Sequence, residues 1–299
     1  MPGMKYAAVP MLLLMFCLGC GKKPEPTLQI FCCETYWNVM REVGGRFASV
    51  YGVHVQLIPV FVPDSEPPLP QEPERETRRR SPTPWRMRPT ERRALAPSRM
   101  EPDGRIGELI ATISDRTRYG DIYLTDSPKQ AEMLHEGAAV AREYPFCVLT
   151  LTLLVAKDNP YRIDSVRSLL DADCRLGIGD PSLDGMGETA LRLLSRYLRV
   201  GDGGRHDERI TLFDRHDKLL TALENREVDA VLVWEPLVLG TAGFADVIEL
   251  PAEERQVVRQ PLLALSMASN QAYGKRFADF LLSPRGREIL KKNGFAVSE

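Results

Sequence analysis

Cysteines are the residues whose spacing first suggests chemistry in this 299-residue sequence, which contains six of them. Beyond the first twenty residues lie Cys32, Cys33, Cys147 and Cys174. Their spacing is not the CxxC pattern of a zinc site, and it leaves open which of them form disulfides. Cys147 and Cys174 fall in apolar, strand-like runs, where a buried free thiol is the expected form. We therefore predict no metal centre from these residues.

Motifs of three common enzyme classes do not occur in the sequence. It contains no GxSxG, HExxH or phosphate-binding P-loop, and the GDGG cluster at 201–204 is interpreted as a surface turn. The composition is that of a globular protein, with 43% hydrophobic and 27% charged residues, and the net charge of −2 does not indicate a nucleic-acid partner. We expect a binding protein that is not an enzyme and needs no cofactor.

The first twenty residues predict export. Lys5 is their only charged residue, and an almost wholly apolar run follows at 7–18. About a dozen apolar residues are too few to span a bilayer of about 30 Å, but they are typical of a signal peptide. The closing Leu-Gly-Cys resembles a bacterial lipobox, which implies acylation of Cys20 and a lipid anchor in the membrane. We expect a signal peptide at 1–19, a polar tether at 20–27, and a location in the periplasm or cell envelope; a plain signal peptide or an uncleaved anchor is the alternative.

Hydrophobic periodicity after residue 27 predicts alternating strands and helices. The predicted strands are 28–32, 53–62, 121–125, 148–156, 174–178, one around Leu212, 229–234, 247–250 and 262–267. The predicted helices are 36–50, 105–116, 129–136, 165–171, 187–198, 217–226, 275–282 and 285–293, the last with Ser283 as N-cap and Pro284 at its first position. This alternation predicts an α/β fold of two lobes, each a mainly parallel sheet flanked by helices, with long strands near 148–156 and 260–267 crossing between them.

A change of composition interrupts the first lobe at 62–104. This segment holds ten of the 23 prolines, nine arginines and eight acidic residues. Few apolar residues are available for burial, so we expect a disordered or loosely packed insertion. An arginine-rich surface that contacts a partner or ligand is the alternative, although the acidic residues nearly cancel its charge. Lobe I is then predicted at 28–145 plus 262–299, and lobe II at 146–261.

Six segments, taken in order, resemble the periplasmic molybdate-binding proteins of ABC transporters. They are FCCETYWN at 31–38, GDIYLTD at 120–126, LLVAKDNP at 153–160, LGIGDPSLDGMGETA at 176–190, LTALENREVDAVLVW at 220–234 and FADFLLSPRGREILKKNGF at 277–295. The resemblance implies the type 2 solute-binding fold with a ligand cleft between two lobes. It also implies a small oxyanion ligand of the molybdate or tungstate type, held at helix N-termini, and an ABC transporter permease as partner.

The resemblance further implies five ligand-binding positions, which are Thr35, Asp103, Met186, His216 and Trp234. Thr35 keeps the hydroxyl of the family's serine, and Met186 would contribute its backbone N–H. Trp234 stands where the family has tyrosine and keeps one N–H donor. Asp103 would bring a carboxylate close to the anion, and a protonated His216 would offset that charge.

Each of these positions also has a purely structural interpretation. Thr35 and Asp103 are then helix caps, His216 a solvent-facing residue in a first helical turn, and Trp234 part of the core. A soft metal site formed by Asp103, His216 and Cys33 is a further alternative. For the whole protein, the alternative is a sensory or scavenging binding protein of the same fold that takes another anion or a metal ion. An effector-binding domain of a regulator is disfavoured, because the export signal stands where a DNA-binding helix pair would lie.

Overall fold

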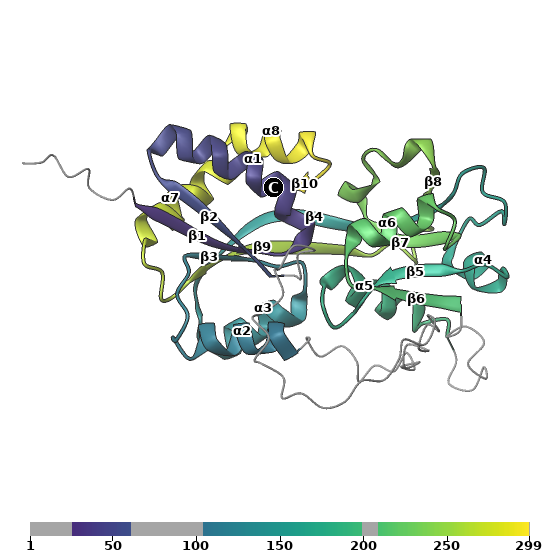
Figure 1. Ribbon diagram of the computed structural model, residues 1–299, viewed down its shortest axis with the longest axis horizontal. Helices are drawn as coiled ribbons and strands as arrows, with labels where there is room; N and C mark the ends of the chain where they lie inside the picture. Colours follow the sequence, from purple (N-terminus) through teal and green to yellow (C-terminus); the bar gives the residue numbers. More distant parts are fainter. Residues whose placement is uncertain (1–25, 61–103, 199–208, 299) are drawn as a thin grey trace, which may run out of the picture.

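The computed structural model describes residues 26–60, 104–198 and 209–298. The predicted signal peptide, Cys20, Asp103 and nearly all of the predicted insertion at 62–104 lie outside these residues. The described chain forms two α/β lobes side by side (Figure 1), as predicted. The strands form one continuous sheet in the order β2-β1-β3-β9-β4-β7-β5-β6.

Lobe I is built on three parallel strands. These are β1 (Thr27–Cys32), β2 (His54–Pro59) and β3 (Ile122–Leu124). One face carries α1 (Glu34–Tyr51), α7 (Gln271–Leu282) and α8 (Pro284–Lys292), and the other carries α2 (Gly104–Ser114) and α3 (Pro128–Glu136) (Figure 1). The apolar residues of α1 fall at three- and four-residue steps, so one side of this helix is buried against the sheet.

Lobe II repeats this plan with a second parallel set. Its strands are β5 (Leu176–Gly179), β6 (Ile210–Phe213) and β7 (Ala230–Trp234), with β8 (Ala245–Ile248) pairing against β4. Its helices are α4 (Val166–Asp171), α5 (Gly185–Leu194) and α6 (His216–Glu224), with short 3₁₀ turns at Glu235–Val238 and Thr241–Gly243. Strands β5 and β7 are buried throughout because helices cover them, whereas the edge strand β6 is only partly buried.

Two long antiparallel strands join the lobes, which confirms the predicted double crossing. They are β4 (Val140–Ala156) and β9 (Val257–Leu265), and the short β10 (Ala296–Val297) also pairs with β4. Strand β4 begins at Val140, earlier than the predicted 148. Its first half was not predicted because it carries exposed residues such as Arg142 and Glu143 and has no apolar pattern. Backbone pairing with β9, rather than an apolar pattern, holds that half in the sheet. The predicted residue boundaries of the lobes stay a prediction.

The four cysteines of the described chain are free thiols and buried. Burial raises the pKa of all four thiols, that of Cys174 to about 11. Because the thiolate is the reactive species, we expect none of the four to react with Ellman's reagent in the native protein, and four additional thiols to react after denaturation. Reaction of any of them before unfolding would contradict this arrangement.

Candidate functional site

The two lobes meet at the N-termini of α1, α5 and α6 and at the ends of β3 and β7. At the centre of this junction lies Asp126, two residues beyond β3 and only 1% exposed. Its Oδ2 accepts hydrogen bonds from Thr35 Oγ1 at 2.5 Å and from Trp234 Nε1 at 2.9 Å. Its Oδ1 accepts one from the Gly185 backbone N–H at 3.1 Å. Three donors from both lobes therefore converge on one carboxylate group.

Helix starts and a strand end position these donors. Thr35 lies in the first turn of α1, and Gly185 is the first residue of α5, so both donate where a helix presents unpaired N–H groups and a partial positive charge. Trp234 is the last residue of β7, and its own backbone N–H donates to Met186 Sδ at 3.3 Å. The local folding of three elements thus builds a site that suits an anionic oxygen group.

A second cluster adjoins the first, with His216 at its centre. The His216 ring pairs through Nε2 with Asp184 Oδ2 at 3.0 Å, and its backbone N–H donates to Glu34 Oε2 at 3.2 Å. Burial alone would lower the pKa of His216, but the hydrogen bond and charge of Asp184, with the charges of Glu34 and Asp126, raise it to about 9. The imidazole is therefore a buried cation at neutral pH. Its Nδ1 is among the few buried polar atoms that have no hydrogen-bond partner in the described chain.

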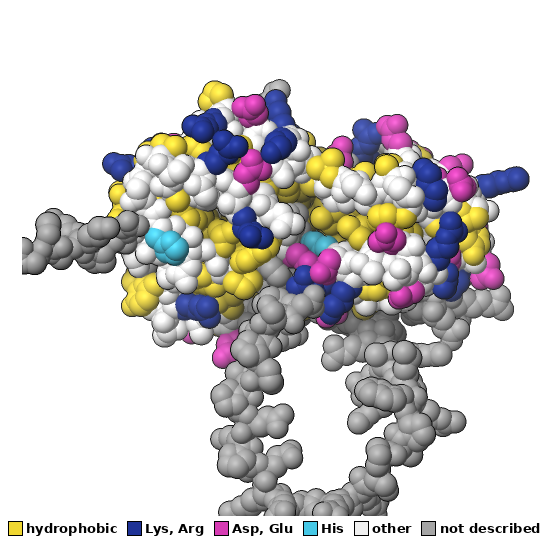
Figure 2. All heavy atoms as spheres, turned by 45° about the horizontal axis from the view of Figure 1, so that its top comes forward, with side chains coloured by type: hydrophobic (Ala, Val, Ile, Leu, Met, Phe, Trp, Pro, Cys, Tyr) yellow, Lys and Arg dark blue, Asp and Glu magenta, His cyan; other side chains and the backbone are white. Residues whose placement is uncertain are grey.

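Partly buried carboxyl groups surround this cation. Burial raises the pKa of Glu34 against the opposing charges of His216 and Arg215, and burial likewise raises the pKa of Asp184. On the other side of Asp126, Ser127 Oγ donates to Glu188 Oε2 at 2.9 Å, again across the lobes. Figure 2 shows acidic and histidine side chains close together where the lobes meet. The junction therefore holds several carboxyl groups, and their charge is only partly offset by bases.

The structure brings together four of the five predicted site residues. Thr35, His216 and Trp234 lie around Asp126 and Asp184, and Met186 packs beneath Trp234, fully buried. Asp103, the fifth, lies outside the described residues. Contact between any of these residues and a solute stays a prediction.

Two structural interpretations of these residues are wrong. Thr35 is not the N-cap of α1, because Cys33 holds that position. His216 is not solvent-facing, because only 4% of it is exposed. Trp234 is core, as one interpretation expected, and is also a hydrogen-bond donor. The N–H that faces the central carboxylate belongs to Gly185, the first residue of α5, which begins two residues earlier than predicted. A contact of the Met186 N–H with a solute stays a prediction.

Sequence reasoning missed the acidic residues of the junction. Asp126 closes the GDIYLTD segment and directly follows a buried strand, which is where ligand-binding residues of α/β sheets gather. Asp184 precedes a helix and caps it, with Oδ1 accepting from the Gly187 N–H at 2.6 Å. These two signals were present in the sequence, but neither one indicates which donors the carboxylates meet.

Within the described ranges, neither a metal-binding cluster nor a membrane-spanning helix occurs. There, no three or more histidine, cysteine or acidic residues are grouped so that they could hold a metal ion. Across 26–60, 104–198 and 209–298, no helix is both long and apolar enough to cross a bilayer.

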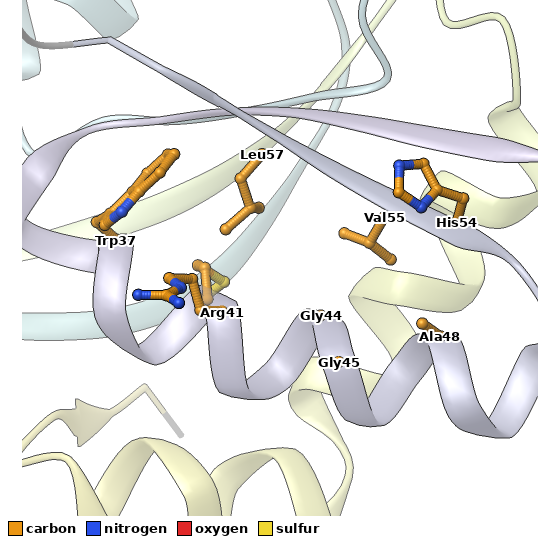
Figure 3. A pocket seen from close by; sticks show the side chains of 9 residues that line it. Trp37, Arg41, Gly44, Gly45, Ala48, His54, Val55 and Leu57 are labelled. Carbon is orange, nitrogen blue, oxygen red and sulfur yellow. The ribbon is translucent and has the colours of Figure 1, made fainter. Parts of the chain in front are cut away.

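A surface groove on lobe I is a competing location for a ligand. It runs between α1 and the edge strand β2 and is lined by Trp37, Met40, Arg41, Gly44, Gly45, Ala48, His54, Val55 and Leu57 (Figure 3). Trp37 and Arg41 lie at one end and His54 at the other, so its polar groups do not converge on one point. Convergent polar groups mark a small-molecule site, and the junction has them whereas the groove does not.

Several known proteins are similar to this chain. A Haemophilus influenzae protein named as a binding protein is 24% identical over 196 residues, covering 64% of this chain and 77% of that protein. The Azotobacter vinelandii periplasmic molybdate-binding protein matches with a TM-score of 0.63 at 13% identity, over 91% of this chain and all (100%) of that one. Iron-bound HitA from Pseudomonas aeruginosa matches with a TM-score of 0.59 at 13% identity, over 91% of this chain and 85% of that one. These two structures share the fold with this chain.

The family model described as bacterial extracellular solute-binding protein matches residues 103–296, which is well over half of the sequence. Its match begins within the predicted insertion and includes lobe II, the two crossing strands and the C-terminal helices. The chain therefore belongs to the bacterial extracellular solute-binding proteins.

Proposed function

We propose that this protein is the receptor of an ABC importer, lipid-anchored through Cys20 in the cell envelope, and that it binds a small oxyanion of the molybdate or tungstate type between its lobes. The observation that carries the oxyanion proposal is the convergence of Thr35, Gly185 and Trp234 on one buried carboxylate group. A carboxylate and a tetrahedral oxyanion present the same kind of acceptor, an anionic oxygen. A site that holds the first has donors suited to the second.

The neighbouring histidine supports the same ligand class. His216 is a buried cation, and its Nδ1 is without a hydrogen-bond partner in the part of the chain that the structure describes. A buried donor that lacks an acceptor costs stability, and an anionic oxygen would satisfy it. The Azotobacter vinelandii relative is a molybdate-binding protein, and a shared fold makes that ligand class a natural first candidate here.

A cation is the second candidate solute, and the surplus of carboxyl groups favours it. Glu34, Asp126, Asp184 and Glu188 all lie at the junction. Within the described residues, the donors to the Asp126 carboxylate are the uncharged groups of Thr35, Gly185 and Trp234. HitA was solved with iron bound. A receptor or scavenging protein for an organic cation would use these carboxylates as they lie, and one for a metal ion would have to draw them closer together, because no three of them are grouped as metal ligands in the described residues.

A thermal-shift screen of the full chain separates the two classes. The anion set is molybdate, tungstate, sulfate and phosphate, the cation set is Zn²⁺, Ni²⁺ and Fe³⁺, and sodium chloride at matched ionic strength is the control. A ligand at about 100 times its Kd adds about 2.7 kcal/mol to the unfolding free energy, which corresponds to a rise of several degrees in Tm. We expect at least one oxyanion and none of the cations to raise Tm. A shift with cations alone would reject the oxyanion proposal in favour of the second candidate.

A further inference from the structure

The anion position between the lobes is taken by a side chain of the protein itself. We propose that Asp126 is an internal ligand, whose carboxylate holds the lobes closed without solute and competes with an incoming oxyanion for the same donors. The closure part rests on the contacts described above. The competition part rests on the proposed function, that is, on an oxyanion being the solute.

The division of donors between the lobes supports the closure part. Asp126 and Thr35 both belong to lobe I, whereas Gly185 and Trp234 belong to lobe II. When the lobes part, the carboxylate therefore loses two of these three hydrogen bonds. Each of them is buried and made to a charged acceptor, which is the class of hydrogen bond that contributes most to stability.

Donor capacity supports the competition part. The Trp234 indole and the Gly185 amide carry one N–H hydrogen each, and each of these hydrogens points at Asp126. An oxyanion therefore gains these donors only when the carboxylate has rotated away. If both anions stayed about 4 Å apart, their repulsion at an effective dielectric near 20 would lower solute affinity by about three decades.

The backbone of Asp126 is fixed while its carboxylate is exchanged. The Asp126 carbonyl oxygen accepts a hydrogen bond from Gln260 Nε2 of the crossing strand β9 at 3.0 Å. Only the side chain therefore has to change rotamer to vacate the donors. Other contacts between the lobes, such as that of the His216 N–H with Glu34, do not involve Asp126 and can report closure independently.

Hydrogen exchange at the His216 amide tests closure without any solute. In the Asp126→Ala full chain this amide should exchange at least about tenfold faster than in wild type, because loss of the internal ligand favours the open state. Asp126→Asn, which keeps the side-chain size, serves as a second variant in case the alanine variant does not fold. Asp279→Ala removes an exposed carboxylate of α7 that pairs with Lys275, and should leave the rate unchanged. An unchanged rate in both Asp126 variants would overturn the closure part.

Isothermal titration with tungstate tests competition. Asp126→Ala should bind tungstate at least about 100-fold more tightly than wild type. The upper limit of this gain is the loss of about three decades of affinity that repulsion between the two anions would cause. Adding Thr35→Val to Asp126→Ala should then weaken binding by about tenfold or more, because a donor to a charged oxygen is lost. Equal or weaker binding by Asp126→Ala and Asp126→Asn would overturn the competition part. If no form binds tungstate or any other oxyanion, the proposed function fails, and the exchange rates still decide whether Asp126 closes the lobes.

Discussion

Replacing Gly185 with alanine is expected to lower solute affinity by at least about 100-fold while both lobes stay folded. A Cβ at this position would lie 1.7 Å from the Asp126 carbonyl oxygen and 2.6 Å from the Ser127 backbone nitrogen. Both atoms are backbone atoms of the opposite lobe, so no side-chain rotation relieves the overlap. The start of α5 must move away from lobe I, and the donors of the two lobes then no longer meet.

A second glycine on the same helix provides the contrasting case. A Cβ on Gly187 would meet Gly179 O at 2.3 Å and Asp180 C at 2.8 Å, which are backbone atoms of its own lobe. Gly187→Ala should therefore destabilise the folding of lobe II, by about 1–3 kcal/mol or more for an overpacked position. Gly185→Ala should lower the unfolding free energy less than Gly187→Ala does, because it disturbs contacts between the lobes and leaves the packing within each lobe intact.

Three measurements on each variant distinguish these effects. They are urea unfolding, exchange of the His216 amide, and titration with whichever ligand shifts Tm in the screen. Gly45→Ala is the matched control, because it lies in helix α1 and a Cβ there meets no atom within 4 Å. Alanine at Gly45 should stabilise the helix by up to about 1 kcal/mol and leave binding unchanged. Wild-type affinity in Gly185→Ala would show that the lobes do not close on this glycine.

The order and type of the elements could be predicted from local patterns. The last helix shows why: Ser283 caps it by accepting from the Gly286 N–H, Pro284 opens it, and Gly294 follows it with a φ of +82°. Each of these signals acts within a few residues. The first half of β4 could not be predicted in this way, because its partner strand β9 lies more than a hundred residues further along the chain.

The centre of the site could be predicted only in part. Thr35, His216 and Trp234 lie at element ends, and the resemblance to a known family indicated them. The role of Asp126 depends on contacts with Thr35 and Trp234, which are 91 and 108 residues away in sequence. A carboxylate after a strand has many possible partners, and only closure of the lobes selects these. The contact of the Gly185 N–H with Asp126 has the same origin, since it depends on where α5 begins against lobe I.

Stability is expected to fall as pH rises from about 6.5 to about 9, because of His216. The folded pKa of His216 is about 9, whereas an unfolded histidine titrates near its ordinary value of about 6.5. Below about 6.5 both states hold the proton, and the buried ion pair contributes fully. Between the two values the unfolded chain has lost its proton and the folded chain still holds it, so the unfolding free energy decreases by up to about 3 kcal/mol.

The carboxyl groups around His216 add a trend of the same sign at lower pH. Burial raises the pKa of Glu34 and Asp184, so the folded protein holds their protons more tightly than the unfolded chain does. The stability that they contribute is therefore also lost as pH rises through their raised pKa values. These three groups should accordingly contribute most to stability on the acidic side of neutrality.

Urea unfolding of wild type and His216→Gln at pH 6, 7.5 and 9 tests this titration. The glutamine amide still reaches Asp184 but carries no charge, so it leaves a buried carboxylate without its cation. We expect His216→Gln to lose about 3–5 kcal/mol at pH 6, where the intact pair is strongest, and its stability to change much less than that of wild type between pH 7.5 and 9. His54→Gln, at an exposed position of β2, should retain the wild-type slope. If the unfolding free energy depended on pH with the same slope in His216→Gln and in wild type, another group would carry the pH dependence. The His216–Asp184 pair would then not be the buried ion pair inferred from its 3.0 Å contact.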